Sequence, residues 1–140
     1  MERRYLILTA VQIIAAGVLA WFLVTAKTPW NAQRYIGTAL VIVGISFIVV
    51  ARFQLGRSFS IRPEARQLVT TGLYSKIRNP IYVFGAVMIA GLILIFQRPS
   101  LWLLLAIIVI AQTMRARREA RVLEAAFGDT YREYHRKAWF

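Results

Sequence analysis

The chain contains no cysteine, one histidine and only six acidic residues among its 140. Without cysteine there can be no disulfide, no thiolate metal site and no cysteine nucleophile. The single histidine, His135, cannot build a metal site by itself, so we predict no bound metal. Chemistry that depends on a cysteine or on a metal centre is therefore not expected.

Charged residues are absent from four apolar stretches, at 5–26, 35–51, 81–96 and 101–114, in a chain that is 59% hydrophobic with a mean hydropathy of +0.56. The first can cross a hydrocarbon core of about 30 Å as a helix. The last two would rise only about 21–24 Å, so they need flanking turns, a thinned bilayer or a partly re-entrant hairpin around residues 97–100. We predict an all-α integral membrane protein of one domain (1–140), with about four transmembrane helices near 5–26, 35–51, 80–97 and 101–114.

The 18 basic residues are distributed unevenly around these four stretches. Fifteen fall on one side of the predicted membrane and three on the other. This asymmetry predicts a multi-pass protein with both termini in the cytoplasm. The net charge of +12 then reports topology and contact with membrane lipids, and we predict no nucleic-acid partner. The first stretch is longer than the apolar core of a usual signal peptide, which favours a retained helix.

Two polar pieces remain outside the predicted spans, a loop at 52–79 and C-terminal helices at 115–137. In the loop, Asn79 is a good N-cap and Pro80 suits the first helical position. The start of that helix, beside Arg78, would attract an anion. A simpler interpretation is that Arg78 anchors at lipid headgroups and that Tyr74 and Tyr82 are interfacial aromatics.

In the second piece, strong helix formers predict that the fourth span continues to about Phe127, where Gly128 would stop it. Asp129 or Thr130 could then cap a short last helix. Arg115 and Glu119 are four residues apart and share a helix face. They are either a solvated ion pair or part of a face that closes on the Arg78 corner.

The segments "QLVTTGLYSKIRNPIY" and "EARVLEAAFGDTYREY" resemble the isoprenylcysteine carboxyl methyltransferase family and related membrane phospholipid methyltransferases. The shared pattern is Leu-Val-x-x-Gly-x-Tyr, then Arg-His-Pro-x-Tyr, then Glu-Glu-x-x-Leu-x-x-x-Phe-Gly-x-x-Tyr-x-x-Tyr. It covers about 55–134. Two positions depart from it, because Asn79 replaces the usual histidine and Ala120 stands where a second glutamate is common.

The resemblance implies an S-adenosylmethionine-dependent methyltransferase with its cofactor in a cytoplasmic site and its substrate entering from the bilayer. Carried over by position, the cofactor-binding residues would be Arg66, Gln67, Leu68, Val69, Tyr74, Asn79, Pro80, Ile81, Tyr82 and Glu119. Arg115 would face the methyl acceptor as a catalytic and substrate-binding residue. We further assign Arg78 to the catalytic corner, where it would meet the carboxylate of the cofactor.

The acceptor that we favour is an isoprenylcysteine-like or other lipidic carboxylate, because a carboxylate is already ionised at neutral pH and needs no general base. One alternative is N-methylation of a phospholipid amine, for which His135 could serve as a base. A second is a non-catalytic membrane protein with the same fold. We expect a lipid or lipidated small molecule as partner, in a bacterial or archaeal inner membrane. Glycines at 37, 44, 85 and 91 predict close helix packing within or between chains and leave the oligomeric state open.

Overall fold

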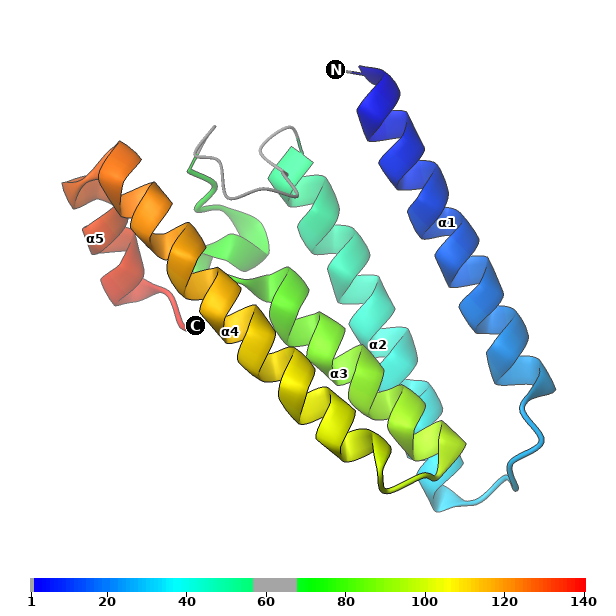
Figure 1. The fold of residues 1–140 in the computed structure, drawn as a ribbon. Helices are drawn as coiled ribbons and strands as arrows, with labels where there is room; N and C mark the ends of the chain where they lie inside the picture. Colours follow the sequence, from blue (N-terminus) through cyan, green and yellow to red (C-terminus); the bar gives the residue numbers. More distant parts are fainter. Residues whose placement is uncertain (1, 57–67) are drawn as a thin grey trace.

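The computed structural model describes residues 2–56 and 68–140, which are helical apart from their connections. In order the elements are α1 (Glu2–Thr25), α2 (Ala32–Leu55), the 3-10 turn η2 (Gly72–Ser75), α3 (Pro80–Phe96), α4 (Leu101–Phe127) and α5 (Asp129–Lys137). Within these ranges the only extended pairing is an isolated bridge between Ile77 and Trp139. The predicted all-α class is therefore confirmed. Figure 1 shows α2, α3 and α4 side by side, with α1 at one edge.

The tightest packing joins α2 and α3, which approach through their glycines. A Cβ atom added to Gly37 would lie 2.5 Å from the carbonyl oxygen of Gly91, and one added to Gly44 would lie 2.8 Å from the Met88 Cβ. Further along, the rings of Phe47 and Phe84 stack at 4.5 Å. The glycines therefore let the two backbones meet, as small residues do in membrane helix pairs. This confirms close packing within the chain for Gly37, Gly44 and Gly91.

The fourth glycine, Gly85, faces a different neighbour. An added Cβ there would have only the Gln112 side chain of α4 within 4 Å, at 3.9 Å. Gly85 therefore lies on the side of α3 that faces α4, with space to spare.

The connection between α1 and α2 is joined to the turn between α3 and α4. Gln97 and Asn31 exchange side-chain hydrogen bonds of 3.2 Å. The helical hairpin expected around residues 97–100 is present, with Gln97 in the left-handed region at φ 55°.

α4 continues well past its apolar half and ends where Gly128 adopts a φ of +54°. The chain then reverses into α5, where the buried Tyr131 and Tyr134, together with Ala138 directly after the helix, pack against Leu123 and neighbouring residues of α4. The expected capping of α5 by Asp129 or Thr130 is wrong. Gly128 occupies the cap position and no side chain caps the helix.

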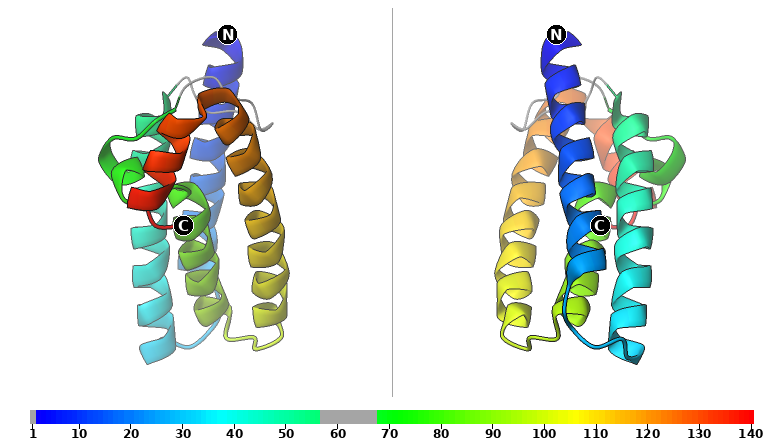
Figure 2. Two further views of the ribbon diagram at one scale, coloured as in Figure 1. Left: turned by 90° about the vertical axis from the view of Figure 1, so that its left-hand side faces the viewer. Right: turned by 90° about the vertical axis from the view of Figure 1, so that its right-hand side faces the viewer.

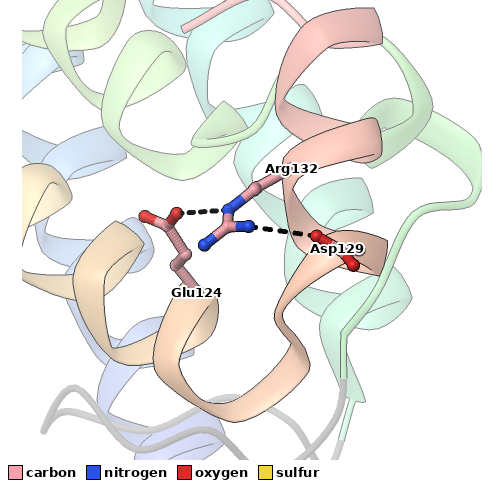
Figure 3. A network of polar contacts seen from close by, with 3 residues as sticks. All are labelled: Glu124, Asp129 and Arg132. Carbon is pink, nitrogen blue, oxygen red and sulfur yellow. Dashed lines mark hydrogen bonds and ion pairs between the residues drawn. The ribbon is translucent and has the colours of Figure 1, made fainter.

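Asp129 instead accepts a bond from Arg132, which also binds Glu124 across the reversal (Figure 3). All three side chains are exposed, so solvent screens these ion pairs and they add little to stability. The fold of the reversal therefore rests mainly on the buried tyrosines.

Large apolar side chains cover the outer faces of the long helices. They include Ile13, Ile14, Trp21 and Val24 on α1, Ile36, Ile42 and Phe53 on α2, and Leu103, Ile107 and Ile110 on α4, each more than half exposed. Among the described residues, one helix, α2, is both long and apolar enough to cross a membrane, while the apolar α3 has 17 residues. Four membrane crossings therefore stay a prediction.

Candidate functional site

The start of α3 has the predicted residues in a partly unexpected arrangement. Asn79 occupies the N-cap position and Pro80 the first helical position, but the Asn79 side chain makes no cap bond. The Asn79 carbonyl accepts bonds from the backbone of Tyr82 and Val83, each 3.1 Å. Its amide Nδ2 instead donates to the carbonyl of Phe140 at 3.3 Å. Proline cannot donate a bond, so its buried ring fits this turn without cost.

The last three residues, 138–140, form a strap across this turn. The Trp139 N–H donates to the Lys76 carbonyl, and the Arg78 N–H donates to the Trp139 carbonyl at 2.9 Å. The Asn79 N–H donates to Phe140 at 2.9 Å. The N–H groups of Arg78 and Asn79, just before α3, are therefore taken by the strap. The predicted anion-attracting corner has to rely on side chains and on the groups inside the first turn of α3.

The central cluster joins α3 to α4 through one carboxylate. The Tyr82 hydroxyl donates to Glu119 Oε1 at 2.7 Å, and Arg115 Nε lies 3.0 Å from the same oxygen. The Arg115 guanidinium also lies 6.0 Å from the centre of the Tyr82 ring. Glu119 is 23% exposed and Arg115 is 42% exposed. Glu119 thus differs from a solvated surface residue, because a tyrosine from another helix binds it.

Tyr74 extends the cluster to the η2 turn. Its side chain is buried, and its backbone carbonyl accepts a 2.6 Å bond from the Tyr134 hydroxyl of α5. Burial, followed by the nearby Tyr134 and Glu119, raises the pKa of Tyr74. The charge of Arg52 acts in the opposite direction on that pKa. Tyr74 therefore stays protonated at neutral pH and is suited to donating a hydrogen bond.

Other predicted residues lie around this cluster. Leu68 packs against the tyrosines of α5, while Val69 and Ile81 are half-buried. Arg78 is half-buried as well, and its Nε is enclosed without a hydrogen-bond partner in the described part of the chain. Arg66 and Gln67 lie outside the described residues. The structure therefore brings together Tyr74, Tyr82, Arg115 and Glu119 at the start of α3.

Sequence reasoning missed two members of the site. Arg52 is only 6% exposed, near the end of α2, and its charge acts on Tyr74. The sequence predicts a loop from residue 52, whereas α2 continues to Leu55 and keeps Arg52 in its last turn. Tyr134 belongs to the quoted motif, but its position alone did not reveal its bond to the Tyr74 carbonyl.

The described residues contain no group of three side chains suited to hold a metal ion. What they offer is a carboxylate, arginines and tyrosines where two apolar helices meet a polar cap. The arrangement places polar and charged side chains at one end of a bundle of helices with apolar outer faces.

Residues 32–130 match the family described as phospholipid methyltransferase, a match that includes all of α2, α3 and α4. The chain belongs to this membrane-associated family of methyltransferases. The matched range contains Tyr74, Tyr82, Arg115 and Glu119 and leaves out α1 and most of α5. Searches of curated proteins and of solved structures found no significant match.

Proposed function

We propose that the chain is an S-adenosylmethionine-dependent methyltransferase that acts on a lipidic carboxylate. The observation that carries this proposal is the three-residue cluster of Tyr82, Arg115 and Glu119, held at the start of α3 within the matched range. A tyrosine and an arginine fixed on one carboxylate, beside apolar helices, suit a charged cofactor that meets an apolar substrate.

The side chains present fit the chemical groups of S-adenosylmethionine. Its ammonium and ribose hydroxyls call for an acceptor, which Glu119 provides. Its carboxylate calls for a cation, and the enclosed Nε of Arg78 has no hydrogen-bond partner in the described residues. Tyr74 and Tyr82 can supply aromatic surface for the adenine. When bound, S-adenosylmethionine would supply an electrophilic methyl group on its sulfonium.

The residues of the chain would act mainly by positioning. Arg115 would orient an acceptor carboxylate, whose ionised oxygen needs no proton removed at neutral pH. Tyr74 is held protonated, so it would donate rather than act as a base. Bringing the acceptor in line and excluding water would supply most of the rate.

In the alternative to this proposal, the methyl acceptor is a phospholipid amine instead of a carboxylate. An ammonium must lose its proton before it can be methylated, and His135 is exposed on α5 with its ring against Tyr131. Of the four clustered side chains, only the Glu119 carboxylate could accept that proton, and it already accepts bonds from Tyr82 and Arg115. A methyl ester is labile to alkali whereas a methylated amine is stable, so transfer of labelled methyl groups followed by alkali treatment distinguishes the two products.

We also propose that all four long helices lie in the bilayer, with both termini on the cytoplasmic side of a bacterial or archaeal inner membrane. Two observations support this arrangement. Large apolar side chains cover the outer faces of α1, α2 and α4. Fifteen of the 18 basic residues also fall at one end of the four apolar stretches. Lipid substrate would then reach the cluster from the bilayer.

The deciding experiment is titration calorimetry of S-adenosylmethionine on the purified protein in detergent. We expect Glu119→Gln to weaken binding by tenfold or more, about 1.4 kcal/mol, because it removes the charge that Tyr82 and Arg115 hold in place. Glu133→Gln is the matched control, since Glu133 is exposed and pairs with Lys137 on α5. Folded wild-type protein that binds no S-adenosylmethionine would favour the non-catalytic alternative.

A further inference from the structure

Beyond the candidate site, the strap that follows α5 presents one exposed large apolar side chain. Every large apolar residue after Met114 is at least partly covered except Trp139, which is 67% exposed. The exposed apolar residues on α1, α2 and α4 form broad surfaces, whereas Trp139 lies on the strap with its ring centre 6.0 Å from that of the partly buried Phe140. A single exposed apolar side chain is common on protein surfaces, so the depth of Trp139 and its charged neighbours have to indicate what it contacts.

The fold brings Trp139 back to the level at which α3 begins. α5 reverses the direction of α4, and Figures 1 and 2 show the C-terminus well below the far end of α4, beside the green start of α3. The strap bonds fix this level, because Trp139 pairs with Lys76 and Arg78, directly before Pro80. Trp139 therefore cannot move away from α3 without breaking backbone hydrogen bonds.

The length of α3 then gives the depth of Trp139 in a bilayer. α3 has 17 residues, which rise about 25 Å from its turn with α4 to its start. A hydrocarbon core is about 30 Å thick. With the turn at one boundary, the start of α3 and the adjoining Trp139 fall at the opposite boundary, where tryptophan is enriched in membrane proteins.

The charges around Trp139 favour anionic lipid. Lys76, Arg136 and Lys137 are all exposed, and they come from the two segments that the strap joins. Glu133, the nearby acid, is paired with Lys137 at 2.7 Å. Three cations against one acid leave a net positive surface, which an anionic membrane attracts.

We propose that Lys76, Arg136, Lys137 and Trp139 form a membrane-docking surface. Trp139 lies among the lipid headgroups of the leaflet at which α3 begins, and the three cations contact the phosphates of anionic lipids. Docking would hold the strap, and through it the Arg78 and Asn79 turn, against the bilayer from which substrate enters. The proposal rests on the membrane arrangement given above and does not depend on catalysis.

The test uses the fluorescence of single-tryptophan proteins in lipid vesicles. Trp21, Trp30 and Trp102 are replaced by phenylalanine, which leaves Trp139 as the only tryptophan. Vesicles are made of phosphatidylcholine, or of an equal mixture with phosphatidylglycerol, and carry phosphatidylcholine brominated near the headgroup or near the chain end. We expect bromines near the headgroup to quench the fluorescence of Trp139 more strongly than bromines near the chain end. We also expect this shallow quenching to increase when the vesicles contain phosphatidylglycerol.

Two control proteins carry their single tryptophan elsewhere, with Trp139 also replaced by phenylalanine. Ile42→Trp, on the exposed face of α2, reports whether the bundle is in the acyl core, and Asp129→Trp reports a fully exposed position. Deep quenching of Ile42→Trp without quenching of Trp139 would overturn the docking surface alone. Failure of Ile42→Trp to be quenched would overturn the membrane arrangement, and the docking surface with it.

The role of the cations is tested separately by Lys76→Gln, Arg136→Gln and Lys137→Gln combined in the Trp139 protein. In vesicles of phosphatidylcholine alone, we expect the quenching of Trp139 in this variant to equal that of the parent protein. Adding phosphatidylglycerol should not increase the quenching in the variant. Equal quenching of the parent protein with and without phosphatidylglycerol would overturn the assignment to anionic headgroups. Circular dichroism establishes that each variant is folded.

Discussion

At the scale of single residues, Arg34 is the most buried charge of the described chain, with 2% of its surface exposed. Its guanidinium donates to the carbonyls of Leu23 and Thr28 and lies 3.9 Å from the Trp30 ring centre. It therefore closes the end of α1 from its position on α2. From the sequence we counted Arg34 only as one of the three basic residues on the far side of the membrane.

We predict that Arg34→Met lowers the free energy of unfolding by about 1–3 kcal/mol, because two enclosed carbonyls lose their donor. The measurement is thermal or denaturant unfolding in detergent, followed by circular dichroism. Arg98→Met is the control, since Arg98 is exposed in the turn before α4 and should leave stability almost unchanged. Equal effects of both substitutions would contradict the role given to Arg34.

Tyr134 provides a second test at this scale, through pH. Burial, followed by the nearby Tyr131, raises the pKa of Tyr134 from 10.0 to about 12, although the charge of Arg78 opposes the shift. Between these values the unfolded chain loses a proton that the folded chain keeps. The contribution of Tyr134 to stability is therefore complete below about pH 10 and is lost as the pH rises toward about 12.

We predict that the free energy of unfolding falls more steeply with pH above about 10 in the wild type than in Tyr134→Phe. The variant also loses the bond to the Tyr74 carbonyl, so it should start from a lower stability at neutral pH. Tyr35→Phe is the control for stability at neutral pH, because Tyr35 is 62% exposed and its replacement should cost less than that of the buried Tyr134. Parallel slopes for wild type and Tyr134→Phe would show that Tyr134 is not protected from ionisation.

At the scale of elements, the pair of α2 and α3 depends on glycine where the backbones meet. A Cβ atom added to Gly91 would lie 2.6 Å from the Gly37 carbonyl oxygen and 2.9 Å from the Val41 backbone nitrogen. Both are backbone atoms, which cannot turn aside as a flexible side chain could. The helices would have to separate.

We predict that Gly91→Ala destabilises the protein by about 1–3 kcal/mol, the usual cost of overpacking. Gly17→Ala on α1 has nothing within 4 Å of the added atom, so it should be neutral or gain up to about 1 kcal/mol from helix propensity. Both variants are compared by thermal unfolding in detergent. Tolerance of alanine at position 91 would mean that α2 and α3 are further apart than described here.

The elements were largely predictable because their signals are local. Charge-free stretches, Pro80 at a helix start and Gly128 at a helix stop all act through neighbouring residues, and the helices and helix ends predicted from them are present. Their crossing of a membrane stays a prediction. The Asn79 side chain was predicted wrongly because its partner, Phe140, lies 61 residues away. Hydrogen bonds of that range follow from tertiary packing, which no pattern near Asn79 reveals.

The candidate site was also predictable only where its signals are local in the sequence. The spacing of Arg115 and Glu119 placed them on one face, and the motif named Tyr82, but their meeting required the α3 and α4 hairpin. Arg52 was missed because its burial depends on how far α2 continues beyond its apolar run. Helix ends are the least certain part of such a prediction.

At the scale of the whole molecule, the arrangement of charges and turns makes a directional prediction. The turn that contains Arg98 and the connection before α2 are joined by Asn31 and Gln97, so they lie at the same end of the bundle. The reversal between α4 and α5 lies at the opposite end (Figure 1). If the four long helices cross the bilayer, these two ends face different compartments.

The chain contains no cysteine, so single cysteines can be introduced without removing any. We predict that Arg98→Cys reacts with a membrane-impermeant maleimide only from the outer face of sealed membranes, and that Asp129→Cys reacts only from the inner face. Both positions are exposed, and the Asp129 side chain is 98% exposed, so access to water does not limit either reaction. Membranes opened with detergent should label both equally, which controls for intrinsic reactivity. Labelling of both cysteines from the same face of sealed membranes would exclude the four-span arrangement, because α3 and α4 would then enter and leave without crossing.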